Sequence, residues 1–113
     1  MDLLVLLKRP EGKTLEFKRD LSSSDGALKT IVAFANTAGG TLLIGVEDRS
    51  RNVRGVADPL DEEERLANLI SDRISPRLVP ELEVLSWRQT QVLALPQACM
   101  CGWAPPTAAL MLS

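Results

Sequence analysis

The sequence of 113 residues contains no histidine and no tyrosine, and its only aromatic residues are two tryptophans and two phenylalanines. Without histidine, a single chain cannot form a Ser-His-Asp or Cys-His nucleophile system, nor a histidine-ligated metal site. Any chemistry must therefore rely on carboxylates, lysine, serine or threonine hydroxyls, or backbone groups.

Cysteines and long apolar runs are also scarce. The two cysteines, Cys99 and Cys101, form a CxC pair that is too close for an easy disulfide and cannot complete a zinc site alone. No apolar run reaches the roughly 20 residues that a membrane-spanning helix needs. The first residues include the acidic Asp2 and no small-residue cleavage site, so we expect no signal peptide. We therefore expect a cytoplasmic protein that makes no contact with membranes.

The charge balance excludes a protein that is basic over its whole surface. The formal net charge is −2, which argues against extensive coating of nucleic acid. The charges are unevenly placed, because residues 1–55 carry nine Lys/Arg against seven Asp/Glu and residues 56–113 carry four against eight. This distribution permits a modest basic patch on the first half of the chain.

The order of the predicted elements indicates an α+β domain. Apolar patterning predicts helices at 27–36 and from 59–61 to Pro76, and strands at 14–18, 41–46, 53–56, 82–87 and 91–95. The order β-α-β-β-α-β-β implies a mixed β-sheet with two packed helices. We assign residues 1–95 to this domain. Residues 96–113 form an uncharged tail with prolines and cysteines, interpreted either as poorly ordered or as a segment that docks on its own core or on a second chain.

A glycine-rich stretch, "NTAGGTLLIGVEDRSRNVRG", spans residues 36–55. Its glycines follow a predicted helix and precede a predicted strand, which reverses the order of a phosphate-binding P-loop, and no lysine follows them. We therefore predict that Gly39 and Gly40 cap the helix rather than bind ATP. Gly45, inside the apolar strand, predicts close approach of another backbone or of a ligand.

Acidic and basic residues gather around the first two predicted strands. If strands 14–18 and 41–47 are neighbours, their acids can converge, and three carboxylates can hold a hard divalent cation for phosphodiester hydrolysis. The acids concerned are Glu11, Glu16 and the Glu47-Asp48 pair. From the spacing alone we favour the simpler interpretation that these acids are solvated.

The basic residues offer a second kind of site, because an arginine-rich hairpin can contact phosphates along a groove. The candidates are Lys13, Lys18, Arg19, Arg49, Arg51 and Arg54. A solvated turn with scattered charge is the alternative. Neither Trp87 nor Trp103 sits in a basic run, so the sequence gives little support to base stacking.

Two segments, "EGKTLEFKRDLS" and "IVAFANTAGGTLLIGVEDRSRNVRGVADP", resemble the Schlafen-type AlbA-like domain of bacterial transcriptional regulators and vertebrate Schlafens. The resemblance covers roughly residues 8–95 and implies an α+β fold that binds nucleic acid. An older label for the family, a divergent AAA ATPase domain, finds no support in the glycine-rich loop. After residue 95 the chain departs from the family, which leads us to interpret 96–113 as a truncated or atypical end.

In vertebrate Schlafens, three acids of this domain form a metal-dependent endoribonuclease site. Their motif positions match Glu11, Glu16 and Asp48, with Glu47 replacing an aspartate beside the last of them. The Schlafen nuclease uses two such lobes whereas this chain has one, and a dimer could supply the second.

Three hypotheses follow. The first is a DNA-binding domain of a transcriptional regulator, homodimeric and without a cofactor, in which the six basic residues contact phosphates. The second is an endoribonuclease in which the three acids hold Mg²⁺ or Mn²⁺. The third is a non-catalytic assembly module that associates through an exposed strand and the apolar tail.

Overall fold

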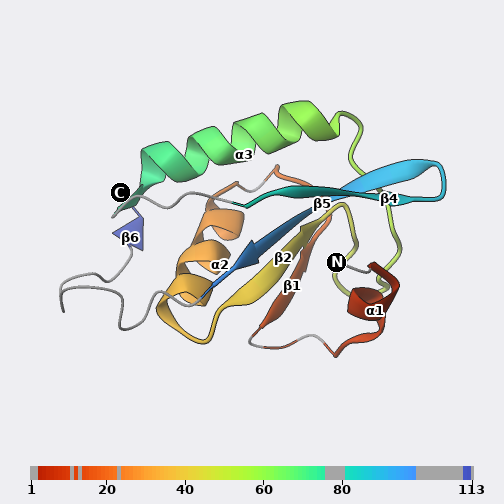
Figure 1. The fold of residues 1–113 in the computed structure, drawn as a ribbon, viewed down its shortest axis with the longest axis horizontal. Helices are drawn as coiled ribbons and strands as arrows, with labels where there is room; N and C mark the ends of the chain where they lie inside the picture. Colours follow the sequence, from red (N-terminus) through yellow and green to blue (C-terminus); the bar gives the residue numbers. More distant parts are fainter. Residues whose placement is uncertain are drawn as a thin grey trace.

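A four-stranded mixed sheet forms the centre of the molecule (Figure 1). The computed structural model describes residues 3–10, 12, 14–22, 24–75, 81–98 and 111–112. The helices are α1 (Leu3–Lys8), α2 (Ser24–Asn36) and α3 (Pro59–Arg73). The strands are β1 (Leu15–Lys18), β2 (Gly40–Ile44), β3 (Ile74–Ser75), β4 (Glu83–Trp87), β5 (Thr90–Gln97) and β6 (Met111–Leu112).

The strand order in the sheet is β1-β2-β5-β4. Strands β1 and β2 are parallel, whereas β2–β5 and β5–β4 are antiparallel. Strands β3 and β6 form a separate antiparallel pair, which places the described end of the tail beside the end of α3. The α+β class and the mixed sheet predicted from the sequence are thereby confirmed.

The sheet is covered on both faces. Residues of α2 and α3 pack with one set of sheet side chains, and residues of α1 pack with the other set. Strand β2 contributes to both, since Leu42 and Ile44 join the α2–α3 cluster while Leu43 joins the α1 cluster. All three side chains are fully buried, which confirms the prediction of a strand without a solvent-facing side.

The glycines that flank β2 make sharp changes of direction. Gly39 has φ +84° and its amide donates to the Phe34 carbonyl at 2.9 Å, a capping arrangement that ends α2. Gly45 has φ +108°, and a Cβ there would lie 3.2 Å from the carbonyl carbon of Gly55. The predicted roles of Gly39 as a helix cap and of Gly45 as a point of close backbone approach are both confirmed.

Three local features in the first half of the chain differ from the sequence prediction. Helix α1 was not predicted, because the stretch "LLVLLK" is almost uniformly apolar and has no period that separates helix from strand. Helix α2 begins at Ser24, three residues before the predicted start. Residues 53–56 form one bridge, Val46–Val53, instead of a strand, since Gly55 has φ +78° and the Val56 amide turns to the Gln91 carbonyl.

Across the described ranges, no helix is both long enough and apolar enough to cross a membrane.

Candidate nucleic-acid interface

One end of the sheet collects most of the cations that the sequence singled out. Because β1 and β2 are parallel and β5 is antiparallel to them, the chain leaves β1 and β2 at the end where β4 turns into β5. The Lys18 carbonyl accepts from the Gly45 amide at 2.8 Å, and the Val56 amide donates to the Gln91 carbonyl at 2.7 Å. These bonds hold residues 18–20, 45–55 and 87–90 together, and we call this set the basic end.

The basic end differs in charge from the whole molecule. Its three segments carry six Lys/Arg and three Asp/Glu, a net charge of +3, whereas the whole chain carries −2. The six cations are Lys18, Arg19, Arg49, Arg51, Arg54 and Arg88. Five of them were predicted from the sequence, while the sixth predicted cation, Lys13, lies outside the described residues.

Glu47 supplies an internal counter-charge in the hairpin of residues 46–53. Its carboxylate accepts from the Ser50 hydroxyl at 2.7 Å and from Arg54 Nε at 2.5 Å. These interactions hold the pKa of Glu47 below its ordinary value, with the Ser50 hydrogen bond as the largest cause and the charges of Arg54 and Arg19 adding to it. Arg54 therefore helps to hold the conformation of the hairpin through its ion pair with Glu47.

Arg51 fastens the same hairpin to α1. One terminal nitrogen, Nη1, donates to the carbonyl of Leu7 at 2.8 Å and also to the carbonyl of Arg9. The guanidinium lies 4.9 Å from the ring centroid of Phe17, a buried residue of β1. A cation at this position suits the end of a helix, where unpaired carbonyls carry partial negative charge.

The other predicted cations at the basic end make fewer interactions with the rest of the protein. Within the described part of the chain, the side chains of Lys18 and Arg49 form no hydrogen bond or ion pair. Arg19 Nε lies 3.4 Å from an Asp20 oxygen, but both side chains are at least half exposed, so the pair is weak. Asp20 is held mainly by Ser22, whose hydroxyl donates at 2.6 Å and lowers the pKa of Asp20.

The acids of the hypothetical metal site are only partly described. The condition of that hypothesis is met, because β1 and β2 are neighbours, with Glu16 half-buried opposite Leu42 on β2 and Asp48 exposed in the hairpin. Glu11 lies outside the described residues. Among those that are described, no three or more Asp, Glu, Cys or His come together as metal ligands. The nuclease hypothesis, with its Mg²⁺ or Mn²⁺, therefore stays a prediction.

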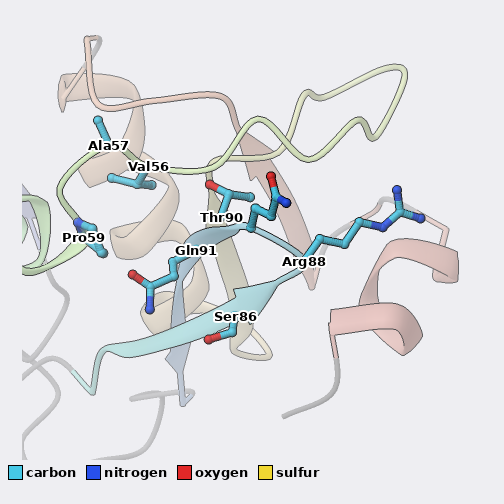
Figure 2. A pocket seen from close by; sticks show the side chains of 8 residues that line it. Val56, Ala57, Pro59, Ser86, Arg88, Thr90 and Gln91 are labelled. Carbon is cyan, nitrogen blue, oxygen red and sulfur yellow. The ribbon is translucent and has the colours of Figure 1, made fainter.

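Two hollows border the basic end, one along the β4–β5 turn and the other on the side of α3. One, of about 520 Å³, lies between residues 56–59 and the turn (Figure 2). Figure 2 shows Arg88 extending away from the other residues that line it, toward α1. The other, of about 350 Å³, brings Arg19 and Arg65 together with the carboxylates of Asp20, Asp58 and Glu62.

A third hollow, of about 370 Å³, lies on the side of α1 and was not foreseen from the sequence. It is lined by Leu7, Arg51, Asn52, Val53, Trp87 and Arg88. Trp87 and Arg88 are more than 30 positions from the hairpin, and only the pairing of β4 with β5 brings them beside it. The sequence offered one usable signal, the short connection between the strands predicted at 82–87 and 91–95.

Residues 11–98 match the sequence profile of the family described as Schlafen, AlbA_2, which confirms the resemblance found in the sequence. The fold is similar to that of the N-terminal domain of an ATP-dependent DNA helicase RecG-related protein from Nitrosomonas europaea. That likeness has a TM-score of 0.70 at 24% identity and covers 88% of this chain and 75% of that one. A second similar structure is the DIP2311 protein of Corynebacterium diphtheriae, with a TM-score of 0.63 at 20% identity, covering 85% and 21% of the two chains. At these identities the likeness concerns the fold.

Proposed function

Because the chain belongs to the Schlafen AlbA_2 family, we propose that it binds nucleic acid, with DNA as its ligand, within a transcriptional regulator. The observation that carries the proposal is the gathering of six cations at one end of the sheet in a protein of net negative charge. Sequence-independent affinity for nucleic acid comes mostly from contacts between such cations and phosphates. The choice of DNA is supported by the similar fold in a protein named for its relation to a DNA helicase.

The partners of each cation indicate whether it positions the hairpin or is available to contact phosphates. Arg51 and Arg54 are engaged by α1 and by Glu47, so they position the hairpin. Arg88 lies over the Trp87 ring, which leaves Lys18, Arg19 and Arg49 as the groups available for the phosphates of a duplex. Three phosphate contacts predict a slope of log affinity against log salt of about −2.7 for duplex DNA. Affinity should accordingly fall about 40-fold between roughly 50 and 200 mM salt.

The test is a titration of labelled duplex DNA over this range of salt, read by fluorescence anisotropy. Arg19→Gln removes one exposed cation and should reduce the slope by about 0.9 while weakening binding to all sequences. Lys29→Gln is the matched control, because Lys29 is exposed on α2 outside the basic end. Absence of binding to both DNA and RNA at the lowest salt would refute the proposal.

We propose in addition that the chain acts as a homodimer. The sheet leaves β1 and β4 at its edges, and an edge strand with unpaired backbone groups can pair with the same strand of a second copy. Light scattering coupled to size-exclusion chromatography measures the mass directly. A monomeric mass across the concentrations used for DNA binding would contradict this part of the proposal.

A further inference from the structure

The hollow on the side of α1 combines features that suit one nucleotide. We propose that it takes a single unpaired base stacked on Trp87, so that the preferred ligand is single-stranded nucleic acid. This inference rests on the proposed function and assigns a substrate class to the same end of the sheet. The volume of about 370 Å³ lies within the usual range of small-molecule sites, about 300–1,000 Å³.

Trp87 is a fixed platform. Its side chain is half-buried and packs on the apolar cluster that contains Phe17 and Val92, together with Leu7 and Val53. The main chain is held as well, since Trp87 pairs with Thr90 across the two-residue turn. An indole that is already ordered loses little conformational freedom when a base stacks on it, and every base has a face that can stack.

Arg88 covers the indole and can be displaced from it. Its guanidinium carbon lies 5.5 Å from the centroid of the Trp87 ring. The Arg88 side chain is exposed and forms no hydrogen bond or ion pair with any other described residue. An exposed cation–π contact is weaker than a stack of a base on an aromatic ring. A base therefore replaces the guanidinium over the ring, and the guanidinium is released to pair with the phosphate beside that base.

Unusual backbone φ angles occur at two residues that line the same hollow. Arg51, with φ 60°, and Arg88, with φ 54°, are the non-glycine residues with positive φ among the residues described, and both line this hollow. Turns that need positive φ favour glycine, asparagine or aspartate. An arginine in such a conformation is strained, and strain of this kind concentrates at functional sites. Within the described residues, the interaction that Arg88 makes in return is its contact with the Trp87 ring.

The polar groups of the hollow complement a nucleotide. Among the described residues, its lining includes the two arginines and no carboxylate, in contrast to the hollow beside α3. The fixed charge of Arg51 attracts phosphate, and the exposed amide of Asn52 offers both a donor and an acceptor to the edge of a base.

The experiment compares labelled oligothymidylate with a duplex of the same length, in a Trp103→Phe background that leaves Trp87 as the only indole. We expect the single strand to quench the fluorescence of Trp87 and the duplex to leave it nearly unchanged. Trp87→Ala should weaken binding of the single strand roughly 5- to 150-fold, since a base–aromatic stack is worth about that factor. Duplex affinity should stay within about twofold, as expected of a site that phosphate contacts do not use.

A second variant separates binding from folding. Arg88→Gly removes the guanidinium and relieves the positive φ, so it should weaken the single-strand complex without lowering the melting temperature. Lys29→Gln should behave as the unmodified protein.

The outcomes separate the two proposals. Equal quenching by both ligands, or unchanged single-strand affinity in both variants, would overturn the base pocket while leaving phosphate binding in place. Tighter binding of thymidine monophosphate than of the oligonucleotide would also overturn it, by showing a site for a free nucleotide. Failure of every nucleic acid to bind would instead refute the proposed function itself.

Discussion

Replacing Arg51 with alanine tests whether this residue serves the fold or the ligand. In the structure, its Nη1 donates to the carbonyls of Leu7 and Arg9, and its guanidinium lies 4.9 Å from the Phe17 ring centroid. The substitution removes all three contacts and unfastens the hairpin from α1. We therefore expect a large loss of stability from a residue that the sequence marks only as a basic surface group.

The size of the loss follows from the contacts. Hydrogen bonds from a charged donor contribute about 1.5–3 kcal/mol when water cannot replace them. Both carbonyls stand at the end of a six-residue helix where water has access, so the lower value applies to the pair together. The cation–π contact adds about 0.5–1 kcal/mol. The sum is about 2–2.5 kcal/mol, and at about 4–5 °C per kcal/mol for a chain of this size the melting temperature should fall by about 8–12 °C.

Urea and thermal denaturation, followed by circular dichroism, measure this loss. Arg51→Gly removes the same contacts but relieves the positive φ, so it should be about 1 kcal/mol more stable than Arg51→Ala. Arg49→Ala is the matched control, since Arg49 is exposed in the same hairpin, and it should change stability by less than about 0.5 kcal/mol. If Arg51→Ala were no more destabilising than Arg49→Ala, the reasoning would be refuted and Arg51 would be available to phosphates.

Two further predictions concern the same end of the sheet. A Cβ at Gly55 would lie 1.7 Å from the Thr90 hydroxyl oxygen at φ +78°, so Gly55→Ala should destabilise by about 3 kcal/mol or more in urea denaturation. Gly12→Ala, with no atom within 4 Å of its Cβ, should be far milder, and equal losses would contradict the geometry. Because the Ser50 hydroxyl lowers the pKa of Glu47 from its ordinary 4.5, the ionised carboxylate stabilises the fold above about pH 4.5, and this contribution disappears as the pH falls through the lowered value. The difference in melting temperature between the unmodified protein and Glu47→Gln should therefore shrink steadily as the pH falls below 4.5, and a difference that stayed constant over that range would contradict this assignment.

Much of the fold could be predicted because local signals agree with the packing. The apolar run at 41–46 has strand length and no polar face, and Leu42, Leu43 and Ile44 are indeed buried between two layers. The pair of glycines before it needs no tertiary information, since the capping geometry is local. Helix α1 could not be foreseen, because its uniform apolar sequence becomes helical only against partners such as Leu15 and Phe17 from a different element.

The candidate interface could likewise be predicted only where its residues are neighbours along the chain. The arginines of residues 49–54 are visible in the sequence because they are neighbours along the chain. Arg88 and Trp87 reach them only through the pairing of β4 with β5 and the hydrogen bond between Val56 and Gln91. Base stacking looked unsupported because no cation adjoins Trp87 in the sequence except Arg88, whereas in space Arg51 lines the same hollow.

The described residues on the two sides of the basic end differ in charge, and under the proposed function this difference would orient a bound strand. Beside α3, the hollow next to Arg19 also contains Asp20, Asp58 and Glu62, whose charges repel phosphate. Beside α1, the described residues that line the hollow include Arg51 and Arg88 and no carboxylate. A polyanion held by the hairpin would therefore be drawn toward α1 and away from the acidic first turn of α3. The strand would then pass Trp87, the one described indole at this end, so that the proposed phosphate attraction and base stacking would share a path.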